Sequence, residues 1–181
     1  MRLVSLSFIL MVVASATFGA SGNDNNLVHD WRQDNGPGEV KFISNHRAPL
    51  PFSETGEPEA TLTMQASKIP DNVPLSRVVE VEIKGIRNGT EIAEYLEEDG
   101  HKPDNGIVSY VEEINGHKVA FIKYRVAGVK GKSPVSPRSV SHAILLKNGK
   151  VYFVHLIVLF AGHQEEVRAD QIRLVKGILR N

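Results

Sequence analysis

Two apolar runs on either side of Asn148-Gly149 form the clearest pattern of hydrophobic and polar positions in the chain. They extend from Ser139 to Phe160 and are rich in β-branched and aromatic residues. Asn-Gly suits a type I′ turn, because both central residues of that turn need φ > 0. The pattern therefore predicts a β-hairpin. Both faces of its second strand are apolar, which indicates a sheet that is covered on both sides.

The two-residue turn also predicts which residues of this hairpin face each other, because its length fixes the register. Lys147 must face Lys150, and counting outward from the turn gives the remaining pairs. On one face these are Leu146 with Val151, Ile144 with Phe153, His142 with His155, and Val140 with Ile157; on the other they are Ala143 with Val154 and Ser141 with Leu156. The register thus predicts that two histidines lie opposite each other within a largely apolar ladder.

Weaker patterns predict the remaining elements. Strands are predicted at 39–43, at 60–69 and at 78–86, where Val79, Val81 and Ile83 would share one face, and a second Asn-Gly hairpin at 107–114 and 117–127. Helices are predicted at about 88–99, from capping residues and a narrow apolar stripe, and at about 164–179, from an amphipathic pattern. Tight turns make neighbouring strands antiparallel. The predicted fold class is therefore α+β, an antiparallel sheet of about six to seven strands with helices packed on its faces.

The beginning of the chain predicts export. Residues 1–20 combine an early arginine, an apolar run and small residues, as in a secretory signal peptide cleaved after Ala16 or Ala20. The apolar run is shorter than the roughly 20 residues that a membrane-spanning helix needs. The polar residues 21–38 predict a tether, and residues 39–181 predict a single domain without a membrane span. We expect a periplasmic or secreted protein. Asn88 begins a glycosylation sequon that matters only in a eukaryotic secretory pathway.

Composition excludes several classes of function. The chain has no cysteine, and therefore neither a disulfide framework nor a thiolate metal site. Its 21 basic and 21 acidic residues give no overall attraction to nucleic acid or to an anionic membrane. The sequence contains no Gly-x-Ser-x-Gly elbow and no His-Glu-x-x-His pair. We therefore expect a protein that is not an enzyme.

Three stretches of the chain carry a resemblance to a known superfamily. They are Glu113 to Tyr124, Ala143 to Leu156 and Ile172 to Leu179. In this order of paired hairpins and closing helix, the chain resembles the superfamily of the photosystem II extrinsic protein PsbP and the bacterial envelope protein DcrB. The resemblance covers roughly residues 60–181 and includes no catalytic motif. It implies a three-layer sandwich around an antiparallel sheet, and accessory or binding roles more often than enzymatic ones.

The opposed pair His142 and His155 is the most specific candidate for chemistry. Directly opposed residues have Cβ atoms about 4.5–5.5 Å apart, which is close enough for two imidazoles to share one Zn²⁺ or a similar divalent ion. A third ligand would come from His117 or from an acidic side chain. The alternative, which we favour from sequence alone, is a neutral pair hydrogen-bonded to each other or to Ser139 and Ser141. Protonating both rings would place like charges together below about pH 6.

A basic segment and the only tryptophan are candidates for contact with a protein partner. Residues 117–150 contain eight lysines and arginines and no acidic residue. Lys130, Lys132 and Arg138, in a Gly-, Ser- and Pro-containing loop, could bind a partner in the cell envelope, or they could be ordinary solvated charges. Trp31 could be a partner anchor, or it could pin the tether onto the domain.

The sequence thus predicts an exported, non-catalytic binding or accessory protein that acts through protein–protein contacts. One alternative is an envelope protein that binds a metal ion through the histidine pair. The other is a hydrolase with an unrecognised site.

Overall fold

The computed structural model describes residues 27–49, 56–93, 100–129, 138–159 and 161–180. The elements in chain order are β1 (Trp31–Gly36), β2 (Glu39–Ser44), β3 (Ala60–Lys68), α1 (Leu75–Gly89), β4 (Thr90–Ile92), β5 (Ile107–Ile114), β6 (His117–Val129), β7 (Arg138–Lys147), β8 (Lys150–Val158), the short 3₁₀ turn η1 (Ala161–His163) and α2 (Gln164–Arg180). The predicted signal peptide, residues 1–20, lies outside the described residues. No helix in the described ranges is long and apolar enough to cross a membrane.

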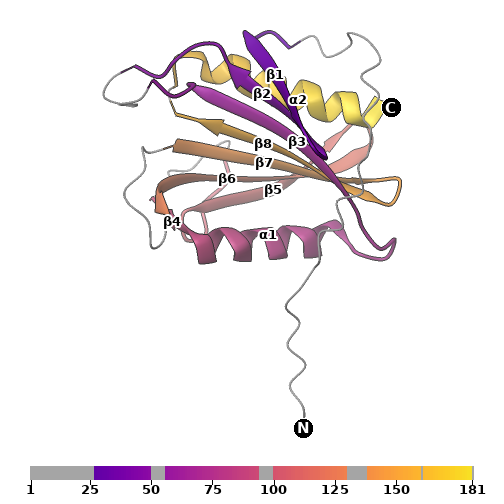
Figure 1. The fold of residues 1–181 in the computed structure, drawn as a ribbon. Helices are drawn as coiled ribbons and strands as arrows, with labels where there is room; N and C mark the ends of the chain where they lie inside the picture. The colour runs from indigo at the N-terminus through magenta and orange to yellow at the C-terminus, as the bar shows by residue number, and fades with distance from the viewer. Residues whose placement is uncertain (1–26, 50–55, 94–99, 130–137, 160, 181) are drawn as a thin grey trace.

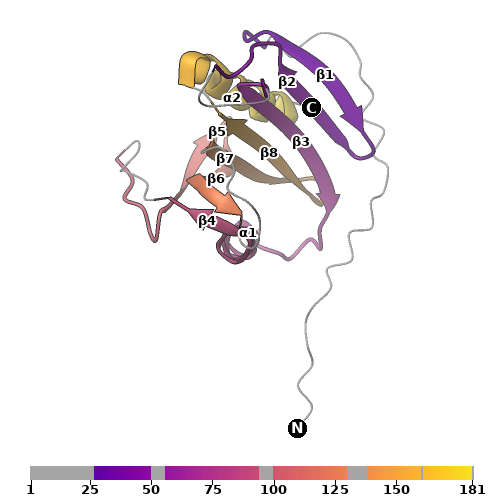
Figure 2. The ribbon, with the colours of Figure 1, turned by 60° about the vertical axis from the view of Figure 1, so that its left-hand side comes forward.

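The strands form one antiparallel sheet between two helices. The sheet has eight strands in the order β1-β2-β3-β8-β7-β6-β4, and β5 also pairs with β6. Figures 1 and 2 show α1 on one face of the sheet and α2 on the other, with the β1–β2 hairpin at the edge beside α2. The predicted α+β class and its three-layer arrangement are therefore confirmed.

Each helix covers its own apolar core. On the α2 side, buried side chains of the helix meet those of the central strands: Val167, Leu174, Val175, Leu179, Leu62, Val119, Phe121, Leu145 and Leu156. On the α1 side, the sheet contributes Ala120, Ile122, Tyr124, Val140 and Ile144. The alternation of side chains along β6, β7 and β8 distributes these residues between the two faces.

The register predicted for the β7–β8 hairpin is confirmed at every position. Lys147 faces Lys150 and His142 faces His155, with the other predicted pairs in place. Asn148 has φ 51° and Gly149 has φ 66°, as a type I′ turn requires. The second Asn-Gly hairpin is also present, as β5 and β6. Both short turns therefore fixed the pairing of their strands.

The strand predicted at 78–86 is wrong, because this segment belongs to helix α1. The helix begins directly after Pro74, whose carbonyl accepts from the amides of Arg77 and Val78. Its sheet-facing residues are Leu75, Val78, Val79, Ile83 and Ile86, at helical spacing. Val81, predicted to be buried, is 48% exposed. The run Val79-Glu80-Val81-Glu82 alternates as a strand would. The apolar residues of the whole segment from Leu75 to Ile86 recur with the helical period instead.

The helix predicted at about 88–99 is wrong over its first turn. Helix α1 ends at Gly89, and Thr90 to Ile92 form β4, which pairs with β6. Residues 94–99 lie outside the described residues. The Asn-Gly-Thr sequence looked like a helix start, whereas its glycine ends the preceding helix.

The tether predicted at residues 21–38 is wrong for its second half. Trp31 to Gly36 form β1, which pairs with β2 along its whole length. Gly38, at φ 75°, lies in the turn between these strands. Most side chains of β1 are exposed, so the strand shows no alternation of polar and apolar residues. The fold therefore starts well before Glu39.

Candidate metal centre

Helix α1 and the β7–β8 hairpin bring three potential metal ligands together. The rings of His142 and His155 stack, with centroids 4.1 Å apart and planes at 21°. The third side chain is Glu82 of α1, whose Oε1 lies 2.9 Å from His142 Nδ1. The ligand atoms of all three residues lie within 4.8 Å of one another. We call these three residues the hairpin site.

Glu82 reaches this site because it shares the sheet-facing side of α1. It lies four residues after Val78 and four before Ile86, both of which pack on the sheet. As part of a strand, Glu82 would have pointed away from its apolar neighbours. From the sequence, a third ligand is expected on an adjacent strand or loop, either His117 or an unnamed acidic side chain; the acidic residue beside the histidines is Glu82, and it lies on a helix.

Two buried ring nitrogens of the hairpin site have no hydrogen-bond partner among the described residues. They are His155 Nε2 and His142 Nδ1, the latter with the Glu82 carboxylate 2.9 Å away as an ion-pair contact. The side chain of His142 is 7% exposed and that of Glu82 is 28% exposed. The other nitrogen of His142, Nε2, is 3.2 Å from Tyr124 Oη. Buried polar atoms normally have partners, so His155 Nε2, which has no polar contact among the described residues, needs an explanation.

The surroundings set the charges of these groups. The pKa of Glu82 is lowered, chiefly by its contact with the His142 ring and against the effect of burial. Burial, with a contribution from the charge of His142, lowers the pKa of His155 to about 4. Burial, and then the charge of Glu82, raises the pKa of Tyr124 to about 12. At neutral pH the site thus offers a carboxylate and an uncharged His155, the forms in which both side chains bind metal ions.

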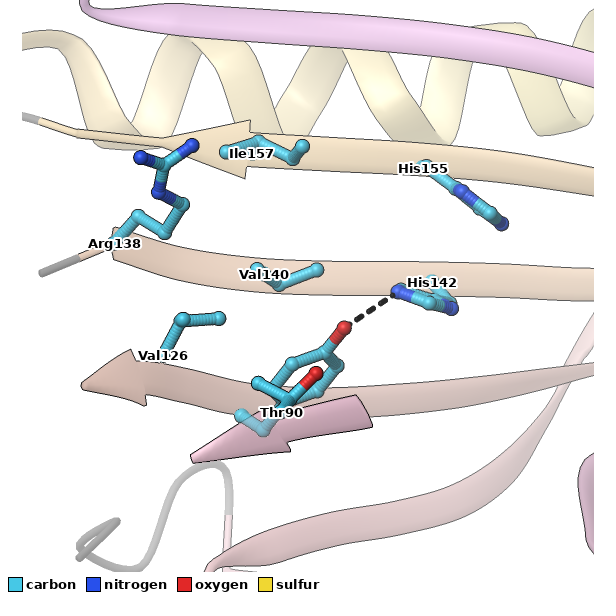
Figure 3. A pocket seen from close by; sticks show the side chains of 8 residues that line it. Thr90, Val126, Arg138, Val140, His142, His155 and Ile157 are labelled. Carbon is cyan, nitrogen blue, oxygen red and sulfur yellow. Dashed lines mark hydrogen bonds between the residues drawn. The ribbon is translucent and has the colours of Figure 1, made fainter. Parts of the chain in front are cut away.

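A pocket of about 310 Å³ adjoins the two histidines on the α1 face of the sheet. It is lined by Thr90, Tyr124, Val126, Arg138, Val140, His142, His155 and Ile157. Figure 3 shows the histidines at one end of the pocket and Arg138 at the other. The wall between the two ends consists of Val126, Val140 and Ile157, with Thr90 as a polar residue among them.

Several residues singled out in the sequence lie elsewhere. His117, considered as a third ligand, is exposed beside the β5–β6 turn. Ser141, considered as a hydrogen-bond partner of the histidines, points to the opposite face and donates to Gln171 Oε1 of α2 at 3.0 Å. Neither His117 nor Ser141 therefore lies beside the histidine pair. The alternation of side chains along β7 separates Ser141 from the pair.

The candidate partner-binding residues are only partly described. Arg138 is the first residue of β7 and lines the pocket, whereas Lys130 and Lys132 lie outside the described residues. Trp31 packs against the α2-side core, and its Nε1 donates to Asp170 Oδ2 at 2.8 Å. These contacts favour the interpretation that Trp31 pins the N-terminal segment onto the domain.

Comparisons with known proteins found solved structures of low similarity to this chain. No protein-family model and no curated protein matches the chain. The solved structures similar to it include the protein of unknown function PA94 from Pseudomonas aeruginosa, at 12% identity and TM-score 0.46, covering 80% of this chain and 94% of that one. They also include the cyanobacterial PsbP protein of Synechocystis sp. PCC 6803, at 13% identity and TM-score 0.38, covering 77% and 84%.

Proposed function

We propose that this protein is an exported, non-catalytic binding protein that holds one divalent metal ion at the hairpin site. The observation that carries the proposal is the convergence of Glu82, His142 and His155, together with the buried His155 Nε2, which has no hydrogen-bond partner among the described residues. Two imidazoles and one carboxylate form a ligand set typical of Zn²⁺.

The distances suit such an ion. Ligands about 2.0–2.1 Å from a tetrahedral zinc lie roughly 3.3 Å from one another. The ligand atoms of Glu82, His142 and His155 are already within 4.8 Å of one another, so small side-chain rotations bring them into place. When Nδ1 of His142 binds the metal, its Nε2–H can donate to Tyr124 Oη, which orients the ring. The fourth position is available to water or to a small ligand in the adjoining pocket.

Binding is a better description of the site than hydrolysis. A zinc ion with three protein ligands and an open position can also activate water, but hydrolysis generally needs a positioned acid or base as well. Apart from the two histidines, the residues that line the pocket are apolar except Thr90, Tyr124 and Arg138. A tyrosine with a pKa raised to about 12 is not suited to act as a base near neutral pH.

Calorimetric titration of Zn²⁺ into the metal-free protein tests this proposal. We expect His155→Ala to bind one ion fewer per chain than the wild type. His117→Ala, which removes an exposed histidine outside the site, should bind as the wild type does. Equal zinc stoichiometry in wild type and His155→Ala would remove the proposal.

A protein partner at the pocket is a second candidate, favoured by the position of Arg138, the basic residue of this loop that the structure describes. The segment that joins β6 to β7 starts at Val129, which pairs with Thr90, and ends at Arg138. Thr90 and Arg138 both line the pocket. A partner that contacts Arg138 would therefore meet the pocket as well.

Charge reversal tests this second proposal. Changing Lys130, Lys132 and Arg138 to Glu should remove a specific protein from material co-purified with the tagged chain from an envelope extract. The matched control reverses three exposed lysines elsewhere, Lys84, Lys102 and Lys118. An unchanged set of co-purified proteins in the loop variant would exclude the role of the loop.

A further inference from the structure

A second group of potential ligands lies where the N-terminal segment meets the start of α2. Glu59 Oε1 is 2.8 Å from His163 Nδ1 and 3.3 Å from His29 Nε2. The ligand atoms of these three residues lie within 4.8 Å of one another. The ring of His46 lies 4.7 Å from that of His163 and 5.2 Å from that of His29, centroid to centroid. We call His29, Glu59 and His163 the N-terminal site.

Asp170 of α2 holds the N-terminal segment in place, and His29 with it. Its fully buried carboxylate accepts from Val28 N at 2.9 Å, His29 N at 2.9 Å, Trp31 Nε1 at 2.8 Å and Arg173 Nη1 at 2.6 Å. Burial alone would raise the pKa of Asp170, but these hydrogen bonds outweigh it and lower the pKa. The position of His29 is thus fixed by its own backbone, independently of its ring.

Glu59 is a buried carboxylate, and its negative charge needs a positive group or a metal ion beside it. Its side chain is 3% exposed, and its contacts are the rings of His163 and His29 and the hydroxyl of Ser44. Within the described residues, no lysine or arginine pairs with it. Buried carboxylates are normally paired with a positive group or bind a metal ion.

The free nitrogen of His29 points to the same chemistry. His29 Nδ1 is buried and has no hydrogen-bond partner among the described residues. Glu166 Oε2 of α2 lies 3.6 Å from it. In metal sites a histidine usually binds the ion through one nitrogen and donates its other N–H to a carboxylate. His29 Nε2 lies 2.7 Å from Ser44 Oγ and 3.3 Å from Glu59 Oε1, so an ion bound there would replace the hydrogen bond to Ser44, while Nδ1 faces Glu166.

We propose that His29, Glu59 and His163 bind a second divalent ion of the Zn²⁺ type, with His46 as the fourth ligand. Four protein ligands make a closed site, as in structural zinc centres. The ion joins residues that precede β1 and β3 to the turn before α2. The ion would therefore hold the N-terminal segment against α2. This site shares no residue with the hairpin site, so the two proposals stand or fall separately.

The experiment counts bound zinc in four forms of the full-length metal-free protein, by calorimetry and by the zinc-induced rise in melting temperature. The forms are wild type, His155→Ala, His163→Ala and the double variant. We expect two ions in the wild type, one in each single variant and none in the double variant. His117→Ala serves as the control and should match the wild type.

A variant of the exposed His46 tests the same site in case His163→Ala does not fold. In the His155→Ala background, His46→Ala removes the proposed fourth ligand and should lower zinc affinity by more than about 10-fold, at least the loss that is typical of an outer partner. Zinc binding in His155→Ala that survives both further substitutions unchanged would overturn the inference. A complete loss of zinc binding in His155→Ala alone would also overturn the inference. It would mean that the wild type binds zinc at the hairpin site and not at the N-terminal site. The opposite result, one ion lost only in His163→Ala, would support the N-terminal site and remove the hairpin site.

Discussion

The hairpin site and the N-terminal site contain the same kinds of side chain but are assembled in different ways. In the hairpin site, two ligands face each other across adjacent strands, and one two-residue turn sets their register. In the N-terminal site, Glu59 and His163 are 104 residues apart in the chain, and His29 arrives from a third segment. A short-range rule encodes the first arrangement, whereas the second depends on the docking of distant segments.

The two sites also differ in their surroundings. The hairpin site lies on central strands and adjoins a pocket, so an ion there would keep an open position. The N-terminal site lies beside an edge hairpin whose first strand is largely exposed. Exposed edge elements open more readily than central strands. We therefore expect the N-terminal site to be lost first when the molecule is disturbed.

Asp170→Ala should separate the two sites most clearly. It removes the acceptor for two backbone amides and the Trp31 indole, so the segment that carries His29 should detach. Charge-assisted hydrogen bonds of this kind are worth roughly 1.5–3 kcal/mol each, so we expect a loss of about 3 kcal/mol in the free energy of unfolding. Hydrogen exchange at Val28 and His29, together with urea unfolding, measures the two effects.

The control for this substitution is Asp30→Ala, which removes an exposed carboxylate of the same segment that bonds to Asn45. Zinc binding attributed to the hairpin site should persist in Asp170→Ala. Equal exchange rates in the Asp170 and Asp30 variants would contradict the view that Asp170 anchors the segment.

The second prediction concerns stability against pH in the metal-free protein. The pKa of His155 falls from 6.5 to about 4 on folding, so between these pH values the unfolded chain binds a proton that the folded chain does not. The free energy of unfolding should therefore decrease as the pH falls through this window, by on the order of 2 kcal/mol from His155 alone. The lowered pKa of Glu82 acts in the same direction below about pH 4.5.

Urea unfolding of wild type and His155→Ala between pH 7 and pH 4, with chelator present, measures this contribution. The variant can differ in absolute stability, because a half-buried side chain is removed, but its decline with pH should be shallower. Parallel curves for the two proteins would show that His155 is not held in its uncharged form by folding.

The sequence predicted correctly those features that depend on residues close together in the chain, and it missed those that depend on contacts between distant segments. The hairpin register, the pair His142–His155 and the amphipathic α2 were predicted because each depends on spacing within a short stretch. Helix α1 was missed because β-branched valines alternate with glutamates in the middle of it, although Leu75, Val78, Ile83 and Ile86 carry the helical period. A longer window would have recovered the helix.

The rest of the candidate chemistry could not be predicted from local patterns. Glu82 was missed as a named ligand because its helix was missed. The N-terminal site has no spacing rule, since nothing along the chain relates His29 to His163 before the strands are arranged. Asp170, which seats His29, looks in sequence like an ordinary polar residue of an amphipathic helix.

The third prediction tests the outer contact of the hairpin site. Tyr124→Phe removes the hydroxyl that lies 3.2 Å from His142 Nε2. Loss of such an orienting partner typically weakens metal binding by about 10–100-fold, and we expect a value in this range for Zn²⁺ at the hairpin site. Calorimetry in the His163→Ala background isolates that site. Tyr152→Phe, on the other face of β8, is the control. Equal affinities in the two phenylalanine variants would show that the hydroxyl does not orient the ring.

The corresponding change in the N-terminal site should have the smallest effect. Glu166 Oε2 is 3.6 Å from His29 Nδ1, which is longer than a hydrogen bond, and the Glu166 side chain is 49% exposed. Since an exposed carboxylate at this distance orients a ring only weakly, Glu166→Gln should lower zinc affinity by less than about 10-fold, below the range for a well-placed outer partner. Titration in the His155→Ala background measures it. A loss as large as that of Tyr124→Phe would mean that zinc draws Glu166 onto His29, and that the N-terminal site tightens on binding more than the hairpin site does.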